Sequence, residues 1–238
     1  MDIGRLRDEI DAELRARGSA ERATRERAYL KSDLDHYGVS VPAVSEVARE
    51  VARRRPPLGR EELLALVEAL WQGTVYERRR AAVGLLELCT DRLQPSDLGT
   101  IERLIRESRT WALVDELAAV VVGALLKRSP EVGVALDRWA VDRDFWIRRS
   151  SLLALLIPLR KGGGDFERFA RYADPMLEEK EFFIRKAIGW VLRDTARKRP
   201  DLVYEWLLPR AARASGVTLR EAVKPLSPEQ RAAVLAAR

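Results

Sequence analysis

The sequence predicts an all-α protein, a single α-solenoid in which short helices stack in pairs. Apolar residues recur at a spacing of three or four along almost all 238 residues, and no segment alternates as a half-buried strand would. An aromatic residue also opens a long helix at Tyr76, Trp111, Trp146 and Phe183, in steps of 35, 35 and 37 residues. This repeat is typical of HEAT-like helical pairs, which bury their apolar faces by stacking on their neighbours.

The individual helices follow from apolar periodicity and from their end signals. Ser19 is a typical N-cap for the second helix, and Pro42 suits the first turn of the third. The glycine-rich segment 161–165 is expected to be a loop between helices, so residues 1–238 are expected to form one domain. The predicted helices are 6–17, 19–35, 42–55, 61–72, 76–89, 96–108, 109–128, 130–142, 145–161, 166–180, 181–198, 201–214, 218–227 and 227–238.

The composition favours a folded protein of the cytoplasm. Hydrophobic residues make up 47% of the chain and charged residues 34%, which argues against disorder. The charged N-terminal segment does not resemble a signal peptide, and no apolar run is long enough for a membrane span. Cys89 is the only cysteine, so an internal disulfide is excluded and a reducing compartment is expected.

The positive charge of the chain is concentrated in one part of it. The net charge is +6, and residues 128–200 contain 16 Lys or Arg against 11 Asp or Glu. Such an excess indicates a polyanionic partner, although an ordinary solvated surface rich in arginine would explain it equally well.

The predicted helix 109–128 raises a question, because it is apolar from Trp111 to Leu126 except for Asp115 and Glu116. A buried, unpaired carboxylate is costly, so Asp115 should have a partner or face a cavity. Trp111 and Asp115 are four residues apart and should share one face of the helix. Glu116 is expected to point elsewhere, toward the surface or a neighbouring helix.

Two further segments place cations beside aromatic rings, FWIRR at 145–149 and FFIRKAIGW at 182–190. Cations suit phosphates and rings suit bases or sugars, so a concave, basic, DNA-binding groove is expected. A carboxylate in such a groove could stabilise the positive charge that develops on a sugar when an N-glycosidic bond breaks. If the second helix of each pair lines the concave side, the inner surface includes Trp111, Asp115, Arg149, Lys186 and Trp190.

The segments YLKSDLDHYGV (29–39), WALVDELA (111–118), FWIRRSSLL (145–153) and EFFIRKAIGWVLR (181–193) resemble the AlkD family of bacterial DNA alkylation repair glycosylases. The resemblance extends from Tyr29 to the VYEW segment at 203–206. It implies HEAT-like repeats and excision of cationic N3- and N7-alkylated purines from double-stranded DNA, the first step of base excision repair. It also implies catalysis without a metal or organic cofactor and without base flipping. Some relatives release bulky natural-product adducts, so general repair and self-resistance are both open.

The resemblance assigns roles to particular residues. Trp111 and Trp190 match the two tryptophans that hold the deoxyribose of the lesion, and Asp115 matches the catalytic carboxylate. The expected DNA contacts are Tyr29, Arg148, Arg149, Lys186 and Arg193. Three of them match positions of the family, namely Tyr29, Arg149 and Arg193. Two departures affect lesion size and strand contacts: Thr110 stands where the family often has a second aromatic residue, and after WIRRSSLLALL (146–156), where some relatives have a lysine, the chain stays apolar up to Arg160.

Structural interpretations of these residues remain open. The tryptophans could pack between helices, Asp115 could accept a salt bridge from Arg149, and Arg149 could be a solvated side chain. His36 lies in a predicted turn without metal-ligating neighbours in the sequence, so no role is expected for it. Two other functions are possible: a catalytically inactive HEAT-repeat protein that binds DNA structures, and a protein-binding scaffold. The chain is expected to be a monomer that associates with the nucleoid, without a membrane or obligate protein partner.

Overall fold

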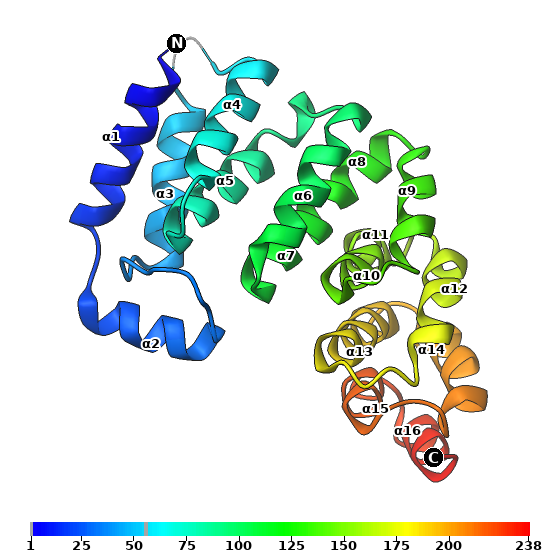
Figure 1. The fold of residues 1–238 in the computed structure, drawn as a ribbon. Helices are drawn as coiled ribbons and strands as arrows, with labels where there is room; N and C mark the ends of the chain where they lie inside the picture. The colour runs from blue at the N-terminus through cyan, green and yellow to red at the C-terminus, as the bar shows by residue number, and fades with distance from the viewer. Residues whose placement is uncertain (1, 55–56) are drawn as a thin grey trace. The chain divides into compact units, whose positions relative to one another are not determined.

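The computed structural model describes residues 2–54 and 57–238, and within them every regular element is a helix (Figure 1). The one pairing between extended segments in these residues is a single bridge from Asp35 to Val75. The all-α prediction is therefore confirmed. None of the described helices is both long and apolar enough to span a lipid bilayer. Arg55, the last residue of the predicted helix 42–55, lies outside the described residues.

The chain divides into two compact units, Met1–Leu117 and Ala118–Arg238. The first unit contains α1 (Ile3–Ala16), α2 (Ala20–Leu30), α3 (Val41–Ala52), α4 (Arg60–Trp71), α5 (Tyr76–Leu88), the short turns η1 (Thr90–Arg92) and η2 (Pro95–Asp97), α6 (Leu98–Ser108) and α7 (Trp111–Glu116). The second contains α8 (Gly123–Arg128), α9 (Val132–Trp139), α10 (Phe145–Leu153), α11 (Leu156–Arg160), α12 (Phe166–Met176), α13 (Phe182–Ala196), α14 (Pro200–Leu207), the turn η4 (Leu208–Arg210), α15 (Gly216–Ala222) and α16 (Pro228–Ala236). The π-helix η3 (Leu117–Val122) joins α7 to α8.

Each unit is built from helix pairs that pack on one another. In the first unit α4 packs on α5, α6 on α7, and α5 on both α3 and α7. In the second, α9 packs on α10, α12 on α13, and α13 on both α10 and α15. Tyr76 and Trp111 are the first residues of α5 and α7, and Trp146 and Phe183 are the second residues of α10 and α13. The predicted helical repeat is therefore confirmed, with one aromatic residue at the start of α5, α7, α10 and α13.

Side chains that cap the helices fix these starting points. Ser19 caps α2 by accepting a hydrogen bond from the backbone N–H of Arg22, and Pro42 lies in the first turn of α3, both as predicted. Asp144 accepts from the N–H of Trp146 at 2.8 Å, and Glu181 accepts from the N–H of Phe183 at 3.2 Å. Two of the four aromatic positions of the repeat, Trp146 and Phe183, are thus held by carboxylate caps.

Several predicted helices are shorter or more divided than expected; the one predicted at 201–214, for example, ends at Leu207 and is followed by the turn η4. The helix predicted at 19–35 ends at Leu30, because Lys31 has a positive φ of 48° and the hydroxyl of Ser32 accepts from the N–H of Leu34 at 3.1 Å. The helix predicted at 145–161 breaks after Leu153 and resumes as α11. The helix predicted at 109–128 contains the π-helix η3. Its wider turns change the direction in which the side chains after it point.

Candidate functional site

Trp111 and Asp115 lie together on α7, in the first unit. The two residues between them on the opposite face, Leu113 and Val114, are fully buried, whereas Trp111 and Asp115 are only half-buried. Their side chains therefore share one partly exposed face of α7, as the four-residue spacing predicts. The hydroxyl of Thr110 caps the helix by accepting from the N–H of Ala112, which gives this non-aromatic residue a structural role.

Tyr29 projects from α2 toward Trp111. Its side chain is 72% exposed, and its ring meets the ring of Trp111 edge to face, with the centroids 5.9 Å apart. Both rings line a pocket of about 200 Å³ in the first unit, whose other lining residues include Glu26, Tyr76, Arg80 and Glu116. Glu116, for which the sequence suggests only a surface or packing role, thus takes part in the wall of this pocket.

The charge of the pocket is mixed but favours cations. Arg80 is buried and forms an ion pair with Glu87 at 2.9 Å, while burial raises the pKa of Glu87. Burial also raises the pKa of Tyr76 to about 12, so its hydroxyl stays neutral. The two further carboxylates, Glu26 and Glu116, together with three aromatic walls, make the pocket more suitable for a positively charged group than for a phosphate.

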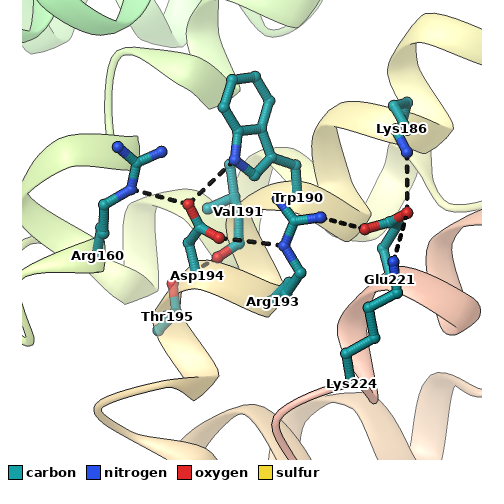
Figure 2. A network of polar contacts seen from close by, with 9 residues as sticks. All are labelled: Arg160, Lys186, Trp190, Val191, Arg193, Asp194, Thr195, Glu221 and Lys224. Carbon is teal, nitrogen blue, oxygen red and sulfur yellow. Dashed lines mark hydrogen bonds and ion pairs between the residues drawn. The ribbon is translucent and has the colours of Figure 1, made fainter.

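Trp190 lies on α13, in the second unit, and its ring is held by a carboxylate that the sequence analysis missed. Its Nε1–H donates to Oδ2 of Asp194 at 3.0 Å (Figure 2). Asp194 is only 2% exposed and also accepts from Arg160 at 2.8 Å and from Arg193 at 3.2 Å. The signal was present in the sequence, because Trp190 and Asp194 have the same four-residue spacing as Trp111 and Asp115.

Lys186 and Arg193, two of the predicted DNA contacts, meet at Glu221 of α15. Arg193 pairs with this carboxylate, Lys186 donates to it at 2.9 Å, and Lys224 lies at 3.1 Å (Figure 2). These bonds lower the pKa of the Glu221 carboxyl to about 2, and the hydrogen bond from Lys186 has the largest effect. Three cations surround one carboxylate, so the cluster keeps a net positive charge that can attract phosphate.

Arg148 and Arg149 make internal contacts at the beginning of α10. Arg149 is only 2% exposed, donates to the carbonyl of Phe183 and lies over the Phe183 ring, 5.8 Å from its centroid. The interpretation of Arg149 as a solvated side chain is therefore wrong. Arg148 donates to both oxygens of Glu179, at 3.0 and 2.7 Å, and to the carbonyl of Asp142 at 2.6 Å. A contact of either arginine with phosphate stays a prediction.

Comparison with known proteins identifies related sequences and folds. Residues 10–226 match the model of the DNA alkylation repair enzyme family. The comparison with curated proteins gives no match.

Three solved structures are similar in fold. A protein described as a predicted DNA alkylation repair enzyme from Enterococcus faecalis has a TM-score of 0.77 and 22% identity, with 89% of this chain and 98% of that chain covered. AlkD2 from Streptococcus mutans has a TM-score of 0.60 and 19% identity, with coverages of 86% and 99%. The Pseudomonas fluorescens alkylpurine DNA glycosylase AlkC, bound to DNA containing an abasic site analog, has a TM-score of 0.53 and 13% identity, with coverages of 98% and 66%.

Proposed function

The chain belongs to the DNA alkylation repair enzyme family, and we propose that it is a monofunctional DNA glycosylase for cationic N3- and N7-alkylated purines in double-stranded DNA. The observation that supports this proposal most directly is the partly exposed face of α7. There a carboxylate, Asp115, follows Trp111 by one helical turn, and Tyr29 contacts the same tryptophan. Rings beside a carboxylate suit a positively charged sugar or base.

The proposed reaction is hydrolysis of the N-glycosidic bond. The bond between C1′ and the purine nitrogen breaks, the bonding electrons leave with the base, and the cationic alkylpurine departs as a neutral molecule. Positive charge develops on the deoxyribose, where the Asp115 carboxylate would stabilise it and orient the attacking water. The water oxygen bonds to C1′ and releases a proton. Trp111 and Trp190 would hold the deoxyribose by contact with their ring faces.

Binding of the duplex is proposed to use the second unit. The cluster of Lys186, Arg193 and Lys224 around Glu221 carries the positive charge that phosphates require. Arg148, Arg149 and Tyr29 are proposed as further contacts. DNA as the partner is supported by family membership and by the similar fold of AlkC, which is described as bound to DNA.

Finer features of the proposal come from the AlkD-like motifs. Excision is expected without a metal or organic cofactor and without base flipping, by a monomer, and bulky adducts are candidate substrates beside methylated purines. Neutral lesions are expected to be poor substrates, because their leaving group lacks the positive charge that weakens the bond. No lysine is assigned to form a Schiff base, so cleavage of the DNA backbone is not expected.

The test compares two duplexes that differ only in one base, N7-methylguanine in the first and neutral hypoxanthine in the second. Free base is quantified by mass spectrometry, with spontaneous release subtracted, and DNA affinity is measured in parallel. We expect 7-methylguanine to be released at least about tenfold faster than hypoxanthine. The proposal is contradicted if the protein binds DNA tightly but releases neither 7-methylguanine nor bulkier cationic adducts. That result would favour a catalytically inactive DNA-binding protein.

A further inference from the structure

Three potential metal ligands from separate parts of the first unit converge, and one of them, Glu26, also lines the pocket of Tyr29 and Trp111. They are Glu26 on α2, His36 in the segment between α2 and α3, and Glu77 on α5, and their ligand atoms lie within 4.8 Å of one another. Within residues 2–54 and 57–238 this is the only group of its kind. The sequence predicts no role for His36, because no metal-ligating residue adjoins it there, but folding brings two to it.

Polar atoms at this position lack ordinary partners. Among the residues that the structure describes, none forms a hydrogen bond with the buried Nδ1 or Nε2 of His36 or with the buried Oε2 of Glu26. The His36 ring is held in place by stacking on Tyr76, with centroids 4.7 Å apart. A buried polar atom without a partner is costly, so Oε2 of Glu26 and one ring nitrogen of His36 together indicate a shared ligand, since one ion can bind only one nitrogen of an imidazole.

Both carboxylates keep lone pairs for such a ligand. Glu77 is fully buried; its Oε1 accepts from the N–H groups of Gly38 and Val39, at 2.7 and 3.1 Å, and its Oε2 accepts only from Tyr37 at 3.0 Å. Glu26 uses Oε1 for Arg22 at 2.9 Å, which leaves Oε2.

We propose that Glu26, His36 and Glu77 form a structural site for one divalent transition-metal ion, with Zn²⁺ as the best match. Zn²⁺ accepts both imidazole nitrogen and carboxylate oxygen, and a water would complete its four ligands here, whereas Mg²⁺ and Ca²⁺ prefer sites made of oxygen alone. The two negative charges of the carboxylates balance the charge of the ion. Bonds of about 2.0 Å to a shared ion require only small rotations of ligands already this close.

The site would anchor a helix that has little else to hold it. No side chain of α2 is buried, yet α2 carries Tyr29, which lies one turn after Glu26 and contacts Trp111. An ion shared by Glu26 and Glu77 would tie α2 to α5. It would thereby hold Tyr29 against Trp111 without taking part in any chemical step, so this inference does not depend on the proposed activity.

The test uses the 238-residue chain, freed of metal by a chelator and dialysed at pH 7.5. We expect Zn²⁺ titrated calorimetrically to bind at one ion per chain, to raise the midpoint of thermal unfolding, and to slow tryptic cleavage after Arg25 and Arg27 of α2. His36→Asn and Glu26→Gln should each lose all three effects. Glu21→Gln, which changes an exposed glutamate of the same helix, should retain them.

Circular dichroism establishes that each variant is folded, and Glu26→Gln alone decides the test if His36→Asn does not fold. The proposal is overturned if the unmodified chain does not bind about one equivalent of Zn²⁺. In that case a water or a protonated His36 would lie between the carboxylates. The proposal is equally overturned if Glu26→Gln and Glu21→Gln bind Zn²⁺ alike.

Discussion

At the scale of single residues, a tryptophan precedes an aspartate by four positions twice in this molecule, and the two pairs differ in burial. Asp115 is half-buried on the open face of α7, whereas Asp194 is buried and bonded to the Trp190 ring. Spacing alone predicts a shared helix face for both pairs. It does not distinguish their roles, because Arg160, which holds Asp194, comes from α11, 34 residues earlier in the chain.

Replacement of Asp194 tests whether it positions Trp190. Asp194→Asn keeps an oxygen for the indole N–H but removes the charge that pairs with Arg160 and Arg193. We expect a loss of about 1–3 kcal/mol in the free energy of unfolding, measured with urea, and base excision slowed by about tenfold. Glu205→Gln, an exposed carboxylate of the same unit, should change neither quantity. Equal stability and rate in the two variants would show that Asp194 has no such role.

The pKa of Glu221 gives a prediction for the pH dependence of stability. Its folded value of about 2 lies below its ordinary value of 4.5, so its stabilising contribution is complete above about pH 5 and is lost as the pH falls toward 2. Glu221→Gln should therefore lower the unfolding free energy by about 2 kcal/mol at pH 7 and by clearly less at pH 3. Urea unfolding at both pH values measures the difference, and a penalty independent of pH would refute this account.

At the scale of helices, the apolar pattern predicts nearly all elements, but it misses the breaks. The helix breaks at Lys31, after Leu153 and in η3 depend on local backbone hydrogen bonds and on contacts with neighbouring helices. The apolar pattern carries no information about either. The sequence also does not show which helices lie so close together that only a glycine fits between them. A Cβ added to Gly189 of α13 would lie 2.9 Å from the Cβ of Glu221 and 3.0 Å from the carbonyl oxygen of Thr218.

This contact predicts opposite effects for two glycine substitutions. Gly189→Ala should destabilise the protein by about 1–3 kcal/mol, because the backbone of α15 cannot move aside freely. Gly99→Ala, in α6, has no atom within 4 Å of the added Cβ and should stabilise by about 0.5–1 kcal/mol through helix propensity. Thermal unfolding of both variants measures the effect. A stabilised Gly189→Ala would mean that α13 and α15 are not closely packed.

At the scale of the whole molecule, the repeat is readable because an aromatic residue stands at the start of the second helix in successive pairs, α5, α7, α10 and α13. The charge excess of residues 128–200 can also be read from the sequence, but the ion pairs that these side chains form cannot. Glu221, which gathers Lys186 and Arg193, lies outside that segment and about 30 residues from both. The metal-ligand group is hidden for the same reason, since Glu26, His36 and Glu77 are brought together only by folding.

The charge cluster predicts how DNA binding responds to salt. Binding of an undamaged duplex should weaken by at least about tenfold between about 50 and 200 mM salt, because phosphate contacts release counterions. Lys186→Ala should reduce the slope of log affinity against log salt by about one, while Lys127→Ala in α8 serves as a control outside the cluster. Fluorescence anisotropy measures both slopes. An unchanged slope in Lys186→Ala would remove Lys186 from the DNA contacts.

The proposed role of Asp115 in the excision of a cationic alkylpurine can be tested by single-turnover kinetics. The rate of 7-methylguanine release from a saturated duplex is compared for the unmodified chain, Asp115→Asn and Asp91→Asn, an exposed control in the same unit. The account predicts a fall of at least about tenfold for Asp115→Asn, with DNA affinity retained, and no change for Asp91→Asn. A folded Asp115→Asn variant that releases the base as fast as the unmodified chain would contradict it.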